Sequence, residues 1–302
     1  MTDAPFGTVL TAMVTPFHDD GSVDLEGVQK VAKHLVDHGH DGLVVSGTTG
    51  ESPTTTKEED GEILAAVKDA VGDRAKLVAG VGTNDTSTSI WLAQQARKVG
   101  ADGVLLVTPY YNKPGQRGIL HHFHQVVDAA ELPVMLYDVP GRTGSQIAFE
   151  TYQAAAAWEP VVAVKDAVGD LARGIRIREL GLAVYSGDDI ANLAWLAHGA
   201  AGFVSVVGHV VGDRLRQMHD EYHRGDAAAA LDTFTGMLPV IEAIMGAPNY
   251  GATAAKAALQ LTGVLDNRRV RSPLVALDDE ELAALRAGLV AAGVELTEGT
   301  RA

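Results

Sequence analysis

Eight short runs of apolar, mostly β-branched residues recur between residues 8 and 207, and each closes on a polar or glycine-containing cluster. Most segments between them carry apolar residues at helical spacing, as Leu25, Val28 and Val31 do. The runs are almost wholly apolar, which is typical of parallel strands buried on both faces. Strands alternating with helices predict βαβ units and a parallel sheet. The expected strands are Thr8–Val14, Gly42–Val45, Leu77–Val81, Gly103–Val107, Val134–Tyr137, Val161–Val164, Ala183–Tyr185 and Gly202–Val207.

Eight such units predict a closed (β/α)₈ barrel, a TIM barrel of the α/β class, rather than an open doubly wound sheet. An open sheet would usually carry a glycine fingerprint after its first strand, and Thr15-Pro16-Phe17 stands there instead. The strand signal stops after an eighth helix, expected over residues 210–225. We therefore expect a catalytic barrel over residues 1–225 and a C-terminal helical appendage over residues 226–302. The appendage is expected to hold an alanine-rich helix ending at Met245, a second over Gly251–Leu261 and a third over Asp278–Ala292.

Composition and charge exclude several classes of function. The 302 residues carry 24 basic and 39 acidic side chains, a net charge of −15, which repels nucleic-acid phosphates and anionic lipid. The absence of cysteine excludes disulfides, thiolate metal sites and cysteine nucleophiles. We find no apolar run near the roughly 20 residues of a membrane helix, and no basic start of a secretory signal. A cytoplasmic protein without nucleic-acid or membrane partners is expected.

Lys165 is the most informative polar residue, because barrels place their chemistry at the C-terminal ends of their strands. It follows the buried run Val161–Val164 directly, whereas most other lysines are expected at helix surfaces or in loops. Burial disfavours the ammonium form and leaves a neutral, nucleophilic amine, the group that forms a Schiff base with a ketone. The alternative is a structural ion pair with Asp166 or another carboxylate.

Two further side chains are candidate partners of that lysine. Arg142 lies in a Pro/Gly-containing loop after the fifth run, and its planar fork suits a substrate carboxylate. The alternative is an ordinary surface arginine. Tyr137 ends the run on the adjacent strand, so its phenol is a candidate proton shuttle, or else a core tyrosine with one satisfied hydroxyl.

The segment Gly47-Thr48-Thr49-Gly50-Glu51 lacks the Gly-Lys-Ser/Thr ending of a nucleotide-binding loop. It predicts a tight turn that presents two hydroxyls and backbone amides to a small oxyanion or carboxylate. The loop after the seventh run is acidic, which disfavours a phosphorylated substrate. His34, His38 and the histidines of residues 121–124 fall on helices outside the barrel, where we expect solvated faces rather than a metal site.

Five motifs then fall in an order and at a spacing that resemble one known family. They are Gly47-Thr48-Thr49-Gly50-Glu51-Ser52, Thr108-Pro109-Tyr110-Tyr111, Tyr137-Asp138-Val139-Pro140-Gly141-Arg142-Thr143-Gly144, Val164-Lys165-Asp166 and Ser186-Gly187-Asp188-Asp189. The sequence is similar to the dihydrodipicolinate synthases, pyruvate-dependent class I aldolases related to N-acetylneuraminate lyase. The resemblance runs through the whole barrel, and the helical tail fits it too. Asp138 departs from the asparagine of many members.

The resemblance implies a lyase in which Lys165 forms a Schiff base with pyruvate, and the resulting enamine condenses with L-aspartate 4-semialdehyde. No metal or organic cofactor is needed, because the imine itself activates the substrate. The resemblance also implies a proton relay of Thr49, Tyr137 and Tyr111. The remaining implied site residues are Thr48 and Thr49 at the pyruvate carboxylate, Arg142 at the aldehyde's carboxylate, and Gly187 with the Val204 backbone.

The resemblance further concerns assembly and regulation. Tyr111 would reach across from a neighbouring subunit, which implies an obligate dimer and a homotetramer built as a dimer of dimers. Feedback-inhibited members bind lysine at a subunit interface with two histidines and a glutamate among other groups. Asn84 and Tyr110 match that site, but a cationic Lys57 would repel the ligand's ammonium groups, so we expect weak or absent inhibition. At three positions of that lysine-binding site this sequence differs from the inhibited members, with Lys57, Asp60 and Thr88.

Two alternatives remain open from the sequence. Another pyruvate aldolase of the same superfamily would act on a keto-deoxy sugar acid or an aromatic aldehyde, but sialic acid lyases typically lack an arginine at the place of Arg142. A non-catalytic ligand-binding barrel would be expected to lose some of its site groups. All the groups of the expected site are present: Lys165, Tyr137, Thr49, Tyr111 and Arg142.

Overall fold

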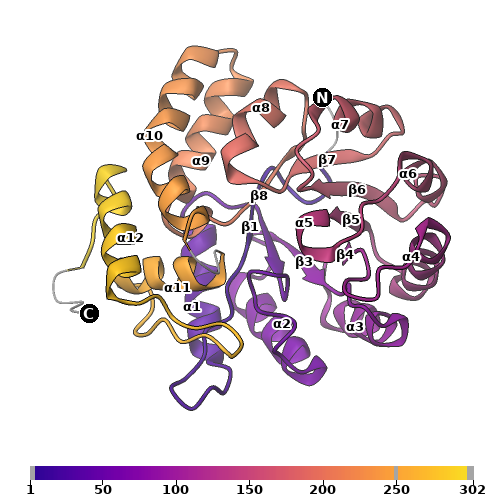
Figure 1. Ribbon diagram of the computed structural model, residues 1–302, viewed down its shortest axis with the longest axis horizontal. Helices are drawn as coiled ribbons and strands as arrows, with labels where there is room; N and C mark the ends of the chain where they lie inside the picture. Colours follow the sequence, from indigo (N-terminus) through magenta and orange to yellow (C-terminus); the bar gives the residue numbers. More distant parts are fainter. Residues whose placement is uncertain (1–3, 248–250, 298–302) are drawn as a thin grey trace.

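The computed structural model describes residues 4–247 and 251–297 and contains a closed barrel of eight parallel strands (Figure 1). Each strand pairs with the next along the chain, and β1 pairs with β8 to close the ring. The predicted TIM barrel is therefore confirmed. The strands are β1 (Val9–Ala12), β2 (Gly42–Val45), β3 (Lys76–Gly80), β4 (Gly103–Val107), β5 (Val134–Asp138), β6 (Val161–Asp166), β7 (Ala183–Ser186) and β8 (Gly202–Ser205).

Helices follow the strands and form the outer ring of Figure 1. Their starts follow from local sequence, since Asp24 and Asp85 accept backbone N–H groups of the first turns, and Thr56 forms a capping box with Glu59. The barrel helices are α1 (Leu25–Asp37), α2 (Lys57–Val71), α3 (Thr86–Val99), α4 (Gln116–Ala130), α5 (Pro140–Thr143), α6 (Phe149–Ala155), α7 (Leu171–Glu179), α8 (Asn192–Ala197) and α9 (Gly208–His223), with a 3₁₀ turn, η1, at Asp189–Ala191.

Side chains of each strand alternate between two apolar layers. On β6, Ala163 belongs to the cluster inside the barrel and Val164 to the larger cluster between strands and helices. Because the period of a strand is two residues, Lys165 shares the inward face of Ala163, and Asp166 shares the outward face of Val164. The same alternation on β5 puts Tyr137 in the inner cluster. The strands are thus apolar on both faces, as their sequences predict.

Six of the eight strands differ from their predicted bounds by one or two residues, and two of these differences bear on the site at the mouth. β6 continues two residues beyond Val164, so Lys165 pairs within the ladder with Tyr137 on β5. β8 ends at Ser205, because the N–H groups of Val206 and Val207 donate to the Asp189 carboxylate at 2.8 and 3.0 Å instead of to a neighbouring strand.

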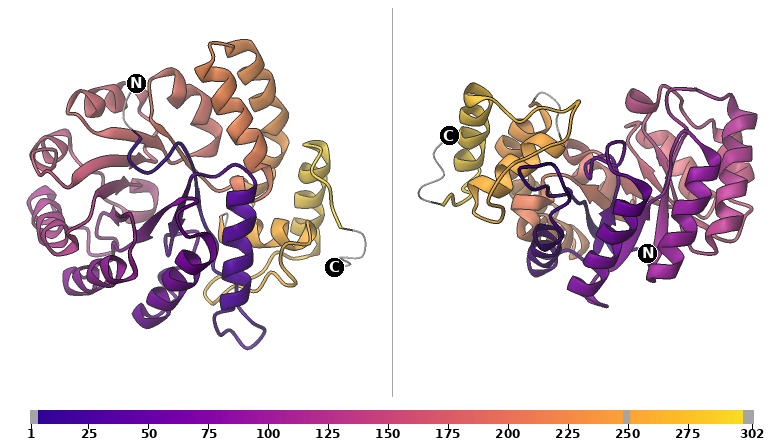
Figure 2. Two further views of the ribbon diagram at one scale, coloured as in Figure 1. Left: turned by 180° about the vertical axis from the view of Figure 1, so that it is seen from behind. Right: turned by 90° about the horizontal axis from the view of Figure 1, so that it is seen from below.

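The appendage consists of α10 (Ala227–Met245), α11 (Ala252–Leu261) and α12 (Asp279–Ala291), close to the three helices predicted. α10 packs on α9 and α12, and α11 packs on the same two helices, so the appendage covers one side of the barrel (Figure 2). Its buried apolar residues belong to the same cluster as the outer layer of the barrel. The predicted boundary between residues 225 and 226 falls in the turn between α9 and α10, and it stays a prediction.

Two sequence expectations about helices were wrong. Within the described part of the chain, α10 is the one helix long and apolar enough to cross a membrane by length and composition, at 19 residues. Packed helices of water-soluble proteins pass the same test, and α10 packs on two neighbours. The expectation of solvated histidines was wrong for some of them: His122 is 4% exposed and bonds to Thr86 Oγ1 at 2.9 Å, and His34 bonds to the His209 carbonyl at 2.9 Å, whereas His121 and His124 are exposed as expected.

Candidate active site

Lys165 and Tyr137 face each other at the C-terminal ends of β6 and β5. The Lys165 Nζ lies 4.4 Å from the centroid of the Tyr137 ring, and both residues are buried. Burial lowers the pKa of Lys165 to about 8, and the nearby positive charge of Arg142 acts in the same direction. Burial also raises the pKa of Tyr137 to about 12, so the phenol is protonated at neutral pH. The pair therefore combines an amine that deprotonates easily with a phenol that can donate a proton.

Asp166 does not neutralise the lysine. Across residues 4–247 and 251–297 no ion pair joins Lys165 to a carboxylate, and Asp166 instead lies 3.5 Å from Arg173 Nη1 on the outer face of the barrel. The inward and outward alternation of β6 separates the two neighbours in sequence. A structural ion pair between Lys165 and Asp166, which the sequence left open, is thus absent.

A cavity of about 630 Å³, the size of a small-molecule site, borders Tyr137, whereas the buried Lys165 is not part of its wall. Its wall includes Tyr137 and Arg142, the latter on the short helix α5 that follows β5. Thr48, Tyr110, Tyr111 and Lys113 line it as well. Hydroxyls and cations dominate the polar part of this wall, which suits a small anionic ligand.

The turn after β2 presents the two threonines differently. Thr48 is exposed to the cavity, and its hydrogen bond to the Tyr137 hydroxyl acts against the rise in the tyrosine's pKa. Thr49 is 7% exposed and does not line the cavity wall. Ser46 and Glu51, which flank the turn, both adopt the left-handed backbone region with φ of 54° and 59°. That conformation is uncommon for residues other than glycine, so packing around the turn must hold it.

The other residues expected at the site lie around this centre. Gly187 donates its N–H to the Asp166 carbonyl at 2.7 Å, and a Cβ there would lie 2.9 Å from the same oxygen, so only glycine fits. Val204 is buried in the inner cluster. Neither lines the cavity wall. Tyr111 borders the cavity, is 87% exposed and has a φ of 71°.

Asp189 is a site residue to which sequence reasoning gave no role. It is 2% exposed and accepts four hydrogen bonds, among them those from Ser205 Oγ at 2.5 Å and Asn192 Nδ2 at 3.0 Å. Its negative charge favours the ammonium form of Lys165 and so limits the fall in that group's pKa. The sequence signal was present in the Asp188-Asp189 pair after the seventh run, but it served there only to disfavour a phosphate.

Arg173 on α7 joins the outward-facing residues of β5 and β6. Its Nη2 donates to Asp138 at 2.8 Å, and its Nη1 lies 3.5 Å from Asp166. Tyr152 also donates to Asp138, at 3.1 Å. Asp138 and Asp166 are register partners, one residue beyond the Tyr137 and Lys165 pair. The guanidinium thus fixes the two strand ends that carry the candidate catalytic pair, and it explains how an aspartate is accommodated at position 138.

We predict that Arg173→Met destabilises the protein by about 3–5 kcal/mol, because it leaves two buried carboxylates without their cation. Adding Asp138→Asn should recover part of that loss, since it removes one of the two charges. The exposed pair of Arg74 and Asp37, at 2.7 Å, provides the control: Arg74→Met should cost less than about 1 kcal/mol. Urea unfolding followed by circular dichroism measures the stability of all three variants. Equal losses of stability in Arg173→Met and Arg74→Met would contradict the proposed bridging of Asp138 and Asp166 by Arg173.

The fold and the site define a class of protein: a (β/α)₈ barrel enzyme with a buried, easily deprotonated lysine at the mouth. The chain belongs to the dihydrodipicolinate synthetase family, whose model matches residues 5–292. The family resemblance predicted from the five motifs is confirmed.

Individual relatives cover nearly the whole chain. The chain is 54% identical over 291 residues to the 4-hydroxy-tetrahydrodipicolinate synthase of Kineococcus radiotolerans, covering 96% of this chain and 94% of that protein. A dihydrodipicolinate synthase structure from Bacillus anthracis superposes with a TM-score of 0.91 at 41% identity, covering 96% of this chain and 99% of that one. The Acinetobacter baumannii enzyme complexed with pyruvate superposes with a TM-score of 0.89 at 32% identity, with coverage of 96% and 99%.

Proposed function

We propose that the protein catalyses the 4-hydroxy-tetrahydrodipicolinate synthase reaction, in which pyruvate condenses with L-aspartate 4-semialdehyde in lysine and diaminopimelate biosynthesis. The observation that carries the proposal is the Lys165 amine, buried 4.4 Å from the Tyr137 ring with a pKa of about 8. Full-length identity of 54% to a relative with that activity supports the same choice. A chain without cysteine also suits the reducing cytoplasm, which we propose as its location.

The first step is attack of the neutral Lys165 Nζ on the C2 carbonyl carbon of pyruvate. The N–C bond forms, the carbonyl oxygen takes up protons and leaves as water, and an imine remains. Loss of a methyl proton gives the enamine, whose terminal carbon attacks the aldehyde carbon of the second substrate. Tyr137, protonated at neutral pH, supplies and recovers protons at the carbinolamine, and Thr49 and Tyr111 complete the relay.

Carboxylate binding orients the two substrates. Thr48, which lines the cavity, and the buried Thr49 offer hydroxyls to the pyruvate carboxylate, and the backbone at Gly187 and Val204 completes the proposed site. Arg142 binds the carboxylate of the aldehyde with its planar fork. A keto-deoxy sugar acid or aromatic aldehyde as the acceptor is the second candidate, and competition between aldehydes for the preformed imine separates the two.

Borohydride trapping with pyruvate tests the mechanism. We expect a single reduced pyruvate adduct on Lys165, located by peptide mass mapping, and none in Lys165→Met. At low pyruvate the trapping rate should rise about tenfold per pH unit and level off above about pH 8, because only the neutral amine reacts. Lys256 is the internal control, since it is buried with the same pKa of about 8 but is held in an ion pair with Glu51. An adduct on Lys256, or none at all, would refute the proposal.

We propose that Tyr111 acts in the site of a neighbouring subunit, in a homotetramer built from two dimers. Tyr111 is 87% exposed in its own subunit, although it borders the active-site cavity. A large exposed aromatic side chain beside an active-site cavity is suited to completing a second copy of that site.

Mixed dimers test the trans role. Tyr111→Phe and Lys165→Met should each lower activity strongly, the first by about 100-fold through loss of a positioned proton donor. A dimer with one copy of each variant contains one site with both native side chains, so the purified mixed dimer should have about half of the unmutated activity. Mixed dimers no more active than the two parents, or a fully active monomer after dilution, would show that Tyr111 acts within its own subunit.

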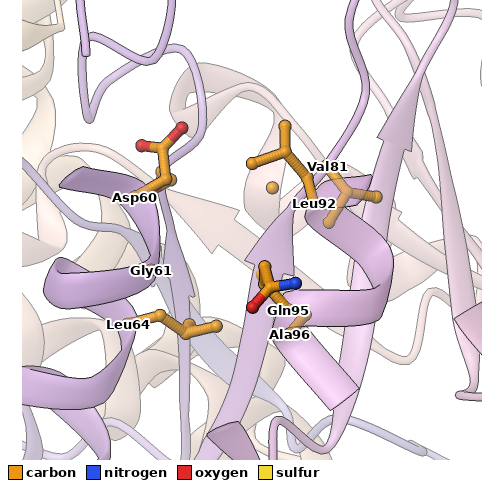
Figure 3. A pocket seen from close by; sticks show the side chains of 10 residues that line it. Asp60, Gly61, Leu64, Val81, Leu92, Gln95 and Ala96 are labelled. Atoms are coloured by element: carbon orange, nitrogen blue, oxygen red, sulfur yellow. The ribbon is translucent and has the colours of Figure 1, made fainter. Parts of the chain in front are cut away.

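We propose weak or absent inhibition by L-lysine. Lys57 places its Nζ 4.9 Å above the Trp91 ring, so a positive charge already occupies that aromatic face. Asp60 of α2 and Leu92 of α3 line a cavity of about 10 Å³ behind it (Figure 3), which is space for about one water molecule. Asp60 accepts from Thr55 at 2.8 Å, and burial raises its pKa to about 6.

A titration of activity with L-lysine checks this proposal. We expect no inhibition up to millimolar concentration, because the fixed ammonium of Lys57 repels the ligand. The matched variant is Lys57→Gln, which removes that charge and keeps a polar side chain. Strong inhibition of the unmutated enzyme below 1 mM would contradict the expectation drawn from Lys57, Asp60 and Thr88.

A further inference from the structure

The protein contains a second deeply buried lysine that the proposed mechanism does not use. Lys256 on α11 is 1% exposed, and burial lowers its pKa to about 8. Its Nζ forms an ion pair with Glu51, donates to the Arg269 carbonyl at 2.7 Å and lies 4.1 Å from the centroid of the Phe17 ring. Because these contacts surround the Lys256 amine, a ketone cannot reach it, and any role of Lys256 must come through its partner Glu51. Sequence reasoning placed most lysines on the surface, and here that expectation was wrong.

Glu51, its partner, ends the turn that carries the two site threonines. Its N–H donates to the Thr48 carbonyl at 3.1 Å, and its own backbone has a φ of 59°. One carboxylate oxygen accepts from Lys256 and the other from the backbone N–H of Arg271 at 2.9 Å. Glu51 is 2% exposed, so its position is fixed entirely by these contacts and the packing around them.

Gly251, the residue before α11, lies near Thr49, because a Cβ placed on it would be 3.8 Å from Thr49 Oγ1. The appendage therefore approaches the turn beside Thr49 and holds it at Glu51 through Lys256. In Figure 1, α11 lies beside the barrel next to α1, so the appendage reaches the mouth from one side.

We propose that Lys256 is a positioning residue for pyruvate: through Glu51 it holds the turn whose hydroxyls bind the pyruvate carboxylate. The inference rests on the proposed roles of Thr48 and Thr49. It gives the C-terminal appendage a function in substrate binding, because the cation that fixes a left-handed residue of the barrel loop comes from α11. The Lys256–Glu51 pair differs from a purely structural ion pair because Glu51 belongs to the same turn as Thr48 and Thr49, whose hydroxyls are proposed to bind the substrate.

Lys256→Met tests the inference in the full-length enzyme. We expect the KM for pyruvate to rise about 10- to 100-fold and the trapping rate at low pyruvate to fall equally, since small displacements of a substrate-positioning group have effects of that size. The KM for L-aspartate 4-semialdehyde should change less than about twofold, because Arg142 lies elsewhere on the wall. The control is Lys76→Met. It breaks an exposed ion pair of 2.9 Å with Asp102 at the N-terminal end of β3, away from the mouth, and should change neither KM.

The double variant Lys256→Met/Glu51→Gln separates positioning from stability. It removes both buried charges, so the melting temperature should recover most of what Lys256→Met loses, while the KM for pyruvate stays raised. If the double variant recovered both the melting temperature and the KM for pyruvate, the role of Lys256 would be structural only and the inference would be overturned. An unchanged KM for pyruvate in Lys256→Met would overturn it too. If Lys256→Met does not fold, the KM values for pyruvate and for the aldehyde are measured in the double variant and in Glu51→Gln instead, and a raised KM for pyruvate alone supports the inference. Absence of a Lys165 adduct in the unmutated enzyme would refute the proposed function, and with it this role of Lys256.

Discussion

The paired ends of β5 and β6 are the constraint on which the whole site depends. Their register sets Tyr137 beside Lys165 and Asp138 beside Asp166. Strand alternation then sends the first pair into the barrel mouth and the second pair out toward the helices. Chemistry and structural support are therefore built from adjacent residues of the same two strands. A shift of register by one residue would exchange them and place two carboxylates where the amine must react.

Two buried lysines and the half-buried Arg173 differ in their ionic partners, and these partners distinguish their uses. Arg173 bridges two outward carboxylates, and Lys256 is paired directly with one. Lys165 feels the charge of Asp189 but is in ion-pair contact with no carboxylate among the described residues. Burial lowers the pKa of Lys165 and of Lys256 alike, to about 8. A lowered pKa alone therefore does not distinguish the two lysines; the absence of a direct counter-ion among the described residues is what favours Lys165 as the proposed nucleophile.

The sequence predicts the features set by neighbouring residues and misses those set by distant ones. Apolar runs place the strands and put Lys165 at a strand end, because both properties are local. The pairing of Lys256 with Glu51 joins residues 205 positions apart, and an isolated lysine in an alanine-rich helix is equally compatible with a solvated face. The bridge from Arg173 to Asp138 and Asp166 likewise depends on how α7 packs against β5 and β6, which local sequence does not show. The early end of β8 depends on Asp189, whose carboxylate replaces a strand as the hydrogen-bond acceptor.

Left-handed residues mark the loops that need support from outside the barrel. Glu51 adopts this conformation while almost fully buried, and α11 and the segment at Arg271 hold it. Tyr111 adopts it too, with a φ of 71°, yet 87% of it is exposed. A strained backbone that is retained at a site implies contacts that determine it. For the turn at Glu51 those contacts come from the chain's own appendage. For Tyr111 the same argument agrees with its proposed role in a second subunit, in which a copy of the chain would support the mouth of the barrel from another side.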